Sequence, residues 1–366
     1  MNDYRLRNHI PISGPATREP CTGDEPDLRV SLGFIPRWYH ARLGIDFSEK
    51  WHMDPLYRYE SLIKMKTYLQ DSFPRLPYFR TTFENGIEKT CATISGVHGI
   101  KLIPMIYGLD VRYFPDDWPD NLPGQFLSKE HLEKLENPDP ASSPIVQQLL
   151  GQMDVIQSNF GCVHGYLNYQ GILNIALKLR GSDIFMDIYD DPGFAHHLFR
   201  HIAETILMVS KLVQARQRRS GFDVNLLSMS NCVMNMVSPD AYEEFVLPYD
   251  RMLSMEYDRF GIHTCNWNVT PYLDVLRKID KMGYIDMGMM SDMKRARAIF
   301  HDARRAVFYP PLELESKSIR EIETDLMKIY RELAPCDIVM ADVTDTTSAK
   351  KVNEFLDIVE NILSME

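Results

Sequence analysis

The stretch GIHTCNWNVTPYLDVLRKIDKMGYIDMGM, residues 261–289, has the form of one strand–helix–strand unit. Its apolar ends, GIHTC (261–265) and YIDMGM (284–289), have the length of strands, and Thr270-Pro271 between them is typical of the start of a helix, here expected over 270–281. Strands that are apolar on both faces are typical of parallel sheets covered by helices. The stretch therefore predicts an α/β fold with a parallel sheet.

The same alternation extends to both sides of this unit. The other strand-length runs are RVSLGFIP (29–36), GIKLIPMIYG (99–108), CVHGYL (162–167), DVNLLSM (223–229), AVFYP (306–310) and DIVMA (337–341). Helical patterns cover 53–70, 192–218, 239–258, 291–303, 317–333 and 347–363. Eight strands that alternate with helices predict a (β/α)8 TIM barrel, and an open sheet with a separate N-terminal domain is the structural alternative.

Two segments do not follow this pattern. Residues 1–28 are polar and rich in proline, which predicts an N-terminal arm in front of a single barrel domain over 29–366. Residues 110–145 are rich in Pro, Asp and Asn, and we expect them to form a long loop excursion over the mouth of the barrel.

Composition excludes several classes of partner. The chain of 366 residues has 40 Lys and Arg against 51 Asp and Glu, a net charge of −11, and no basic tract, so neither nucleic acid nor an anionic membrane is an expected partner. No apolar run approaches the length of a membrane span. The cysteines are widely spread and the N-terminus lacks the apolar core of a signal peptide, which favours a reducing, cytoplasmic setting. A homodimer is compatible with the sequence.

His263 and Cys265 are the strongest candidates for a metal site. They lie two residues apart at the end of a predicted strand, so their side chains point to the same side, toward the mouth of the barrel. An imidazole and a thiolate together suit zinc, which needs at least one further ligand. Asp342, after the last strand, is the first choice for the third ligand, and Asp292 is the second. The alternative interpretation of the pair is ordinary core packing.

Other reactive side chains are expected at the same mouth because they follow predicted strands. These candidate substrate-binding residues are Arg37, Tyr166, Asn168, Asn231, Asn266, Trp267 and Asp292, with Glu313 as a further acidic group. Cys336 precedes the last strand and is expected at the opposite end of the barrel as a structural residue. Cys162 and His164 form a second pair with the same spacing, but Cys162 opens its strand, which favours a core position for both.

Three motifs, in order, carry a resemblance to a known family. They are HGYLNYQGILNIALKLRGSDIFMDIYDDP (164–192), VSPDAYEEFVLPYDRML (237–253) and IHTCNWN (262–268). From about residue 160 to its end the chain resembles the uroporphyrinogen decarboxylase superfamily, and within it the zinc-dependent, corrinoid-linked methyltransferases, whose metal-binding H-x-C matches His263 and Cys265. The resemblance implies a (β/α)8 barrel with its site at the strand ends. It also implies a further thiolate after the last strand, where ADVTDTT offers Asp342 and no cysteine.

The resulting expectation is a methyltransferase that moves a methyl group between a small O-, N- or S-methyl compound, or a thiol acceptor, and a separate corrinoid protein. Zinc on His263, Cys265 and Asp342 would be the metal cofactor, and the corrinoid would be carried by the partner protein. Two alternatives remain. One is a metal-free decarboxylase of a polycarboxylate tetrapyrrole, for which the resemblance implies an arginine-rich motif that is represented here only by Arg37 and Arg42. The other is a non-catalytic barrel that binds a small molecule.

Overall fold

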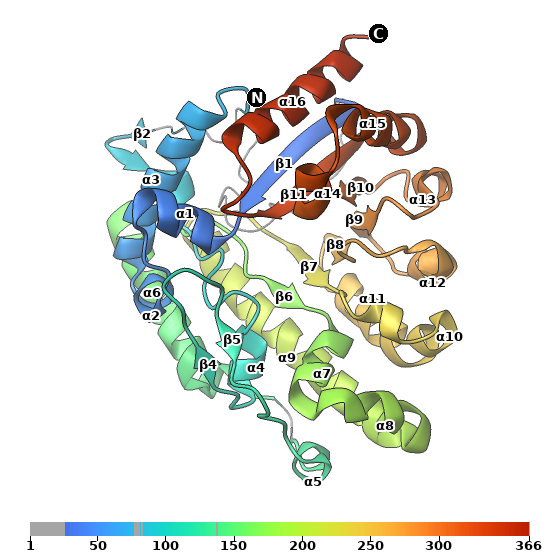
Figure 1. Ribbon diagram of the computed structural model, residues 1–366. Coiled ribbons are helices and arrows are strands. Elements are labelled where there is room, and N and C mark those ends of the chain that lie inside the picture. The colour runs from blue at the N-terminus through green and yellow to red at the C-terminus, as the bar shows by residue number, and fades with distance from the viewer. Residues whose placement is uncertain (1–25, 77–80, 82, 137, 366) are drawn as a thin grey trace.

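A sheet of seven parallel strands forms the centre of the molecule. The computed structural model describes residues 26–76, 81, 83–136 and 138–365. The strands are β1 (Leu28–Phe34), β6 (Tyr169–Gln170), β7 (Leu226–Ser230), β8 (Arg259–His263), β9 (Met282–Gly288), β10 (Arg304–Phe308) and β11 (Cys336–Val343). Their order in the sheet is β1-β11-β10-β9-β8-β7-β6, so that the first strand pairs with the last (Figure 1). That pairing is the signature of a barrel, and the fold is the predicted (β/α)8 barrel.

The wall between β1 and β6 contains a short segment in the position of the second barrel strand. Thr93 forms a parallel bridge with His164, where the Ile94 amide donates to the His164 carbonyl (3.0 Å) and the His164 amide donates to the Ala92 carbonyl (2.9 Å). The strand predicted over 99–108 is therefore wrong: its centre is the helix α4 (Leu102–Ile106). A short apolar run suits a buried helix and a buried strand equally, and here the run packs as a helix.

Helices surround the strands on the outside, as Figure 1 shows. They are α1 (Pro36–Leu43), α2 (Glu49–Met53), α3 (Pro55–Ser72), α6 (Pro144–Phe160), α7 (Ile172–Arg180), α8 (Ile184–Asp190), α9 (Pro192–Arg219), α10 (Pro239–Ala241), α11 (Leu247–Met255), α12 (Leu273–Leu276), α13 (Met293–Ile299), α14 (Pro311–Ser316), α15 (Ile319–Leu333) and α16 (Ala349–Leu363). Their starts follow the sequence signals: the Asp191 carboxylate accepts a hydrogen bond from the Phe194 amide, and Ser318 with Glu321 forms a capping box.

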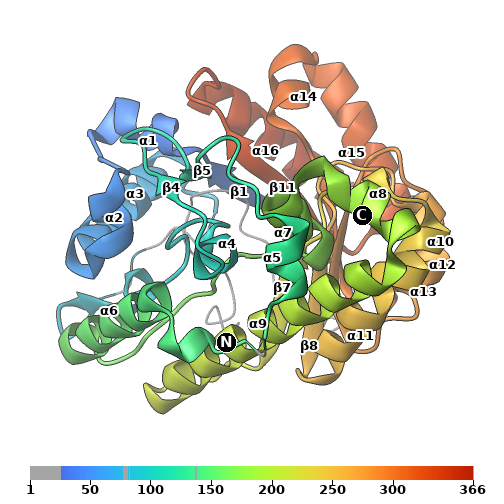
Figure 2. The ribbon, with the colours of Figure 1, turned by 90° about the horizontal axis from the view of Figure 1, so that it is seen from below.

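The predicted excursion spans the mouth of the barrel (Figure 2). It contains the hairpin of β4 (Val111–Arg112) and β5 (Asp120–Asn121) and the helix α5 (Lys129–Glu133). On one side the Phe47 amide, in the segment after α1, donates to the Pro115 carbonyl (2.9 Å), and on the other the Leu127 amide donates to the carbonyl of Leu179 in α7 (2.7 Å). Since α1 and α7 follow β1 and β6 at their carboxyl ends, the excursion crosses between these two strands.

The opposite end of the barrel holds the residues that we expected to be structural. Cys336 is fully buried as the first residue of β11, as predicted. Next to it, the carboxylate of Asp337 accepts hydrogen bonds from the guanidinium groups of Arg29 and Arg304. His164 lies in the bridge to Thr93 with its ring 4.9 Å from that of Phe222, but both His164 and Cys162 are half-buried, so the predicted core position holds only in part. Residues 1–25 of the predicted arm lie outside the described residues. Among the described helices none is long and apolar enough to span a membrane.

Candidate metal centre and mouth cavity

Three side chains converge at the carboxyl ends of β7 and β8. The potential ligand atoms of Cys232, His263 and Cys265 all lie within 4.8 Å of one another. The Cys265 sulfur lies 2.9 Å from the Cys232 sulfur and 2.9 Å from Nε2 of His263. The predicted pair is therefore joined by a second thiol, which the sequence analysis did not select.

Strand register brings the two cysteines together. Ser230, the last residue of β7, pairs with His263, the last residue of β8, and the Asn231 amide continues the ladder by donating to the His263 carbonyl (2.8 Å). Cys232 and Cys265 each lie two residues beyond these strand ends. The signal for Cys232 was present in the sequence as SMSNC after the β7 run, but it becomes visible only when the neighbouring strand is aligned with it.

A buried carboxylate fixes the orientation of the His263 ring. Nδ1 of His263 lies 2.5 Å from Oδ2 of Asp286, a fully buried residue of β9. The Thr264 amide (2.6 Å) and the Tyr284 hydroxyl (2.9 Å) donate to the same carboxylate. With Nδ1 held in this way, Nε2 is the nitrogen that faces the two sulfur atoms. Carboxylate–histidine pairs of this kind commonly support metal-ligating histidines.

The three side chains of the cluster differ in how readily they lose a proton. The hydrogen bond from the Cys265 thiol lowers the pKa of Cys232 to about 5, against the opposing effect of burial. The same hydrogen bond, together with burial, raises the pKa of Cys265. Burial lowers the pKa of His263, but the Asp286 carboxylate outweighs it and holds that pKa well above its ordinary value. A metal ion would displace the protons that Cys265 and His263 retain.

The donor set fits zinc. Two thiolates and one imidazole are ligands that zinc prefers, and three protein ligands leave a fourth position for water or substrate. Tetrahedral zinc with bonds of about 2.3 Å to sulfur separates two sulfur atoms by about 3.8 Å. The sulfur atoms of Cys232 and Cys265 are 2.9 Å apart, so binding requires them to separate by roughly 0.9 Å. Rotation of two cysteine side chains supplies a movement of this size.

The loop after β8 lies against the cluster. The Trp267 indole N–H donates to the carbonyl of Cys232 (2.7 Å), although 45% of the Trp267 side chain is exposed. The backbone of Asn266 passes over Gly288, where an added Cβ would meet the Asn266 carbonyl oxygen at 2.3 Å. Gly288 therefore permits the close approach that sets the path of this loop. Trp267 and Asn266 are at the mouth, as predicted.

Asn231 points away from the mouth, so its predicted role in substrate binding is wrong. Its amide nitrogen donates to the Tyr242 hydroxyl (3.0 Å) and to the Asp250 carboxylate (3.2 Å), in a buried network behind β7. The amide oxygen rests against Gly171, where an added Cβ would lie 1.7 Å from it. Successive residues at a strand end face opposite sides, so Cys232 at the mouth requires Asn231 to face the helices.

Asp342 lies beside the cluster without being one of its three converging ligands. Its charge contributes to the raised pKa of Cys265, and it adopts a left-handed backbone (φ 57°) just before the end of β11. The second choice, Asp292, is wrong as a ligand: it is the N-cap of α13, where its carboxylate accepts from the Arg295 amide (3.0 Å). Cys232 is the third converging side chain, the role predicted for Asp342 or Asp292.

The remaining candidates divide between the mouth and other places. Arg37 lies at the edge of the mouth, where its guanidinium donates to Asp116 and Asp117 of the excursion (3.3 Å each). Glu313 of α14 forms an ion pair with Lys317, the residue after this helix (2.6 Å). Tyr166 does not reach the mouth, because it packs on Phe222 in a buried apolar cluster that includes Leu226, the first residue of β7.

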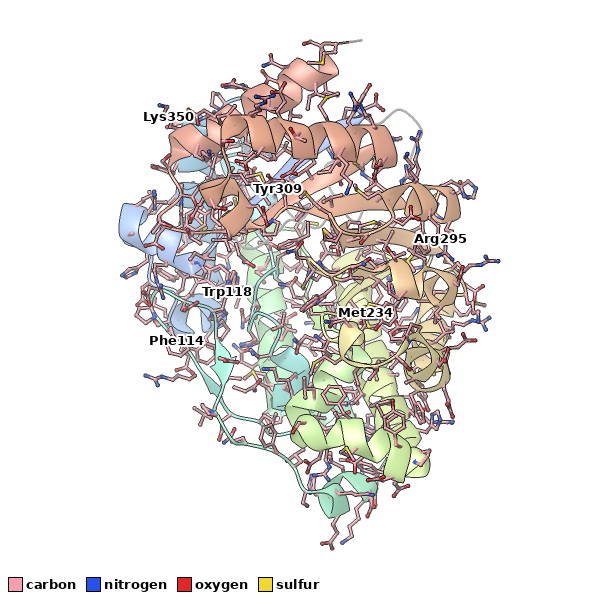
Figure 3. All side chains as sticks on the ribbon, turned by 45° about the vertical axis from the view of Figure 1, so that its right-hand side comes forward. Phe114, Trp118, Met234, Arg295, Tyr309 and Lys350 are labelled. Carbon is pink, nitrogen blue, oxygen red and sulfur yellow. The ribbon has the colours of Figure 1, made fainter. Side chains whose placement is uncertain are left out.

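A cavity of about 550 Å³ lies under the excursion. Its lining residues come from the segment before α4, from the excursion, from the strand ends and from α7; they are Gly99, Ile100, Lys101, Phe114, Asp117, Trp118, Pro119, Asp120, Asn168, Lys178 and Asp342. Asn168, just before β6, and Asp342, near the end of β11, therefore line one cavity; both were predicted to lie at the mouth. Phe114 and Trp118 belong to the excursion, on the side of the molecule away from Met234 and Arg295 (Figure 3). Asp342 lines this cavity, and its charge also acts on Cys265 of the cluster.

Comparison with solved structures gives the protein a relative in fold. A methyltransferase from Methanosarcina mazei superposes with a TM-score of 0.65 over 93% of this chain and 95% of its own, at 12% sequence identity. The chain therefore shares the fold of that protein. A B12-independent methionine synthase from Shewanella sp. W3-18-1, in complex with selenomethionine, gives a TM-score of 0.40 over 60% of this chain and 68% of its own, at 10% identity.

Comparison of the sequence with known proteins does not assign the chain to a family. No protein family matches the chain, and no curated protein is similar enough to count as a relative. Because the identity to the Methanosarcina mazei protein is low, the likeness shows a shared fold and no more. Membership of the uroporphyrinogen decarboxylase superfamily therefore stays a prediction from the three motifs.

Proposed function

We propose that the protein is a zinc-dependent methyltransferase that moves a methyl group between a small O-, N- or S-methyl compound, or a thiol acceptor, and the corrinoid of a separate protein. The observation that carries the proposal is the convergence of Cys232, His263 and Cys265 at the carboxyl ends of two adjacent barrel strands. The fold shared with the methyltransferase from Methanosarcina mazei supports it. In this proposal Cys232 replaces Asp342 as the third protein ligand.

The residues around the cluster have separate roles in this reaction. Bound zinc would polarise the heteroatom of the substrate, or keep a substrate thiol as its thiolate. Asp286 keeps the His263 ring in the tautomer that presents Nε2. Trp267 holds the carbonyl of Cys232 and so fixes the loop that carries this thiolate. Asp342, between the cluster and the cavity, is the carboxylate suited to hold or release the proton of the heteroatom.

An exposed apolar rim supports the proposal of a protein partner. The loops and helix that follow β7, β8, β9 and β10 each carry one large exposed apolar side chain: Met236 (57%), Trp267 (45%), Met290 (80%) and Leu312 (72%). These strands are neighbours in the sheet, so the four side chains belong to one side of the mouth. A group of exposed apolar side chains beside a reactive centre is typical of a protein-binding surface.

Decarboxylation of a polycarboxylate tetrapyrrole has less support. The mouth cavity carries two lysines, Lys101 and Lys178, which the sequence analysis did not consider. They suit one anionic group, whereas a substrate with many carboxylates needs cations on all sides, because unpaired buried anions are costly. Three carboxylates, Asp117, Asp120 and Asp342, line the same cavity.

Methyl transfer to a reduced corrinoid protein tests the function. Zinc-loaded protein is mixed with methylated oxygen, nitrogen and sulfur compounds and a reduced corrinoid protein, and formation of the methylated corrinoid is followed by its visible spectrum. We expect the signal to be lost with a zinc chelator and in His263→Ala, and to persist in Cys336→Ser. No carbon dioxide is expected from uroporphyrinogen. Decarboxylation that is insensitive to chelation would overturn the proposal.

The rim has its own matched test. Met236 and Met255 are equally exposed (57% each), but Met255 ends α11, just before β8, and so belongs to the opposite end of the barrel. We expect Met236→Glu to raise the KM for the corrinoid protein about tenfold, with kcat and zinc content unchanged, whereas Met255→Glu should have no effect. Equal effects of the two substitutions would exclude the rim as the docking surface.

A further inference from the structure

Lys101 is a buried cation with unused hydrogen-bond donors. It lies beneath the excursion with 4% of its surface exposed, and its ammonium donates to one carboxylate, that of Asp120, at 2.5 Å. An ammonium carries three donors. Among the described residues Asp120 is its one hydrogen-bond partner, so two donors of a buried charge are left for whatever fills the cavity. Burial lowers the pKa of Lys101, the Asp120 carboxylate opposes this effect, and the charge of Lys178 adds to it.

Lys178 brings a second positive charge to the same cavity. It projects from α7 and is half-buried, and its side chain forms neither a hydrogen bond nor an ion pair with any residue that the structure describes. Its charge acts on both Lys101 and Asp120, which means that the three groups lie close together. Two like charges at one wall repel each other, and an anion between them would remove that repulsion.

The carboxylates of the cavity do not neutralise this wall. Asp117 accepts a hydrogen bond from Arg37, and Asp120 accepts from Lys101. Asp342 also lines the cavity, and its charge acts on Cys265. The charge of Lys178 is therefore in excess at the wall formed by the segment before α4 and by α7. Phe114, Trp118 and Pro119 supply apolar surface to the same cavity.

We propose that Lys101 and Lys178 form a subsite for a carboxylate on the small-molecule substrate, whose apolar body lies along Phe114 and Trp118 and whose other end faces the metal cluster. The proposal rests on the proposed function for the identity of that other end, and on the cavity alone for the carboxylate. A carboxylate fits the wall because it accepts hydrogen bonds from two ammonium groups at once.

Benzoate and benzamide are suitable probes, because they share an aromatic body and differ in charge. Binding of each to the zinc-loaded full chain is measured by calorimetry at constant ionic strength. We expect benzoate to bind at least tenfold more tightly than benzamide. Lys178→Gln should remove this preference, Lys178→Arg should retain most of it, and Lys294→Gln, at an exposed lysine of α13, should leave it unchanged. Zinc content should be equal in all variants.

Three results would overturn the subsite: no binding of benzoate, equal binding of benzoate and benzamide, or a benzoate preference that survives Lys178→Gln. In the last case, loss of binding after zinc removal would assign the carboxylate to the metal. Failure of the proposed function is a separate result. A protein that takes up no zinc and transfers no methyl group, but keeps Lys178-dependent benzoate binding, would refute the methyltransferase and retain the subsite.

Discussion

Cys232 and Cys265 lie at equivalent positions of two neighbouring parallel strands, each two residues beyond the strand end, and their sulfur atoms are 2.9 Å apart. The pairing of Ser230 with His263 fixes this equivalence. A register shift of one residue would turn one of the two thiols away from the mouth. The candidate metal site thus depends on strand register, and the sequence pair of His263 and Cys265 supplies two of its three protein ligands.

Cys232→Ser should reduce zinc from about one ion per chain to a small fraction, because it removes one of three protein ligands. Elemental analysis measures this directly. Cys162→Ser is the matched control, since Cys162 is also half-buried but lies outside the cluster. Asp342→Asn should retain zinc. A full complement of zinc in Cys232→Ser, or its loss in Asp342→Asn, would return Asp342 to the ligand set.

Asp286→Asn should weaken zinc affinity about 10- to 100-fold, because the amide no longer stabilises the orientation and basicity of His263. Competition with a chromophoric chelator gives the affinity. Tyr284→Phe removes one hydrogen bond from the same carboxylate and keeps its charge, so its effect should be several-fold smaller. If both substitutions weaken binding equally, packing rather than the Asp286 charge supports the ligand.

Gly171→Ala should reduce both stability and zinc affinity. An added Cβ would meet Oδ1 of Asn231 at 1.7 Å and its Cγ at 2.8 Å, and displacement of Asn231 moves the adjacent Cys232. Gly151→Ala is the control, because no atom lies within 4 Å of its added Cβ and the site is helical. Urea unfolding and zinc titration of both variants are the measurements. Normal zinc affinity in Gly171→Ala would mean that Asn231 does not position Cys232.

Asp250 should contribute a decrease in the stability of the protein as the pH rises from 5 to 7. Burial raises the pKa of this carboxyl to about 7, although hydrogen bonds from Tyr242 and Asn231 act in the other direction. The folded state then binds a proton that the unfolded state has released, so the stabilisation is present at low pH and is lost as the pH approaches 7. Asp250→Asn should remove a decrease of roughly 2 kcal/mol between these pH values.

Urea unfolding at several pH values measures this slope. Asp302→Asn, at a carboxylate whose side chain is 89% exposed, should keep the slope of the natural protein. A slope that is the same with and without Asp250 would mean that its carboxyl is ionised throughout this range.

The repeated units were predictable because each carries its own signals. From β7 onward the predicted strands overlap the observed ones within about three residues, and helix starts at Asp191-Pro192 and Ser238-Pro239 follow local capping chemistry. The second strand was not predictable in this way. Residues 92–95 contribute a single bridge to the wall, which leaves no periodic pattern, whereas the stronger apolar run at 99–108 belongs to a helix.

Part of the candidate site was predictable for a similar reason. His263 and Cys265 lie in one strand, where spacing determines direction, but Cys232 joins them through a neighbour whose register no single segment encodes. Asn231 was predicted at the mouth because it follows a strand. Side chains alternate along a strand, however, and that of Asn231 faces the helices. Lys101 lies just before α4 and Lys178 lies in α7, several residues beyond the nearest strand, so no strand end marks them in the sequence. They line one cavity beneath the excursion.

The excursion covers the mouth between β1 and β6, whereas the apolar rim follows β7 to β10 on the other side. In the proposed reaction, a small molecule beneath the excursion and a protein on the rim would therefore approach Cys232, His263 and Cys265 from separate sides. Both reactants can be present at once, and we expect direct transfer within a ternary complex. Initial rates at several fixed concentrations of the corrinoid protein should give intersecting double-reciprocal lines, whereas parallel lines would require that one reactant leaves before the other arrives.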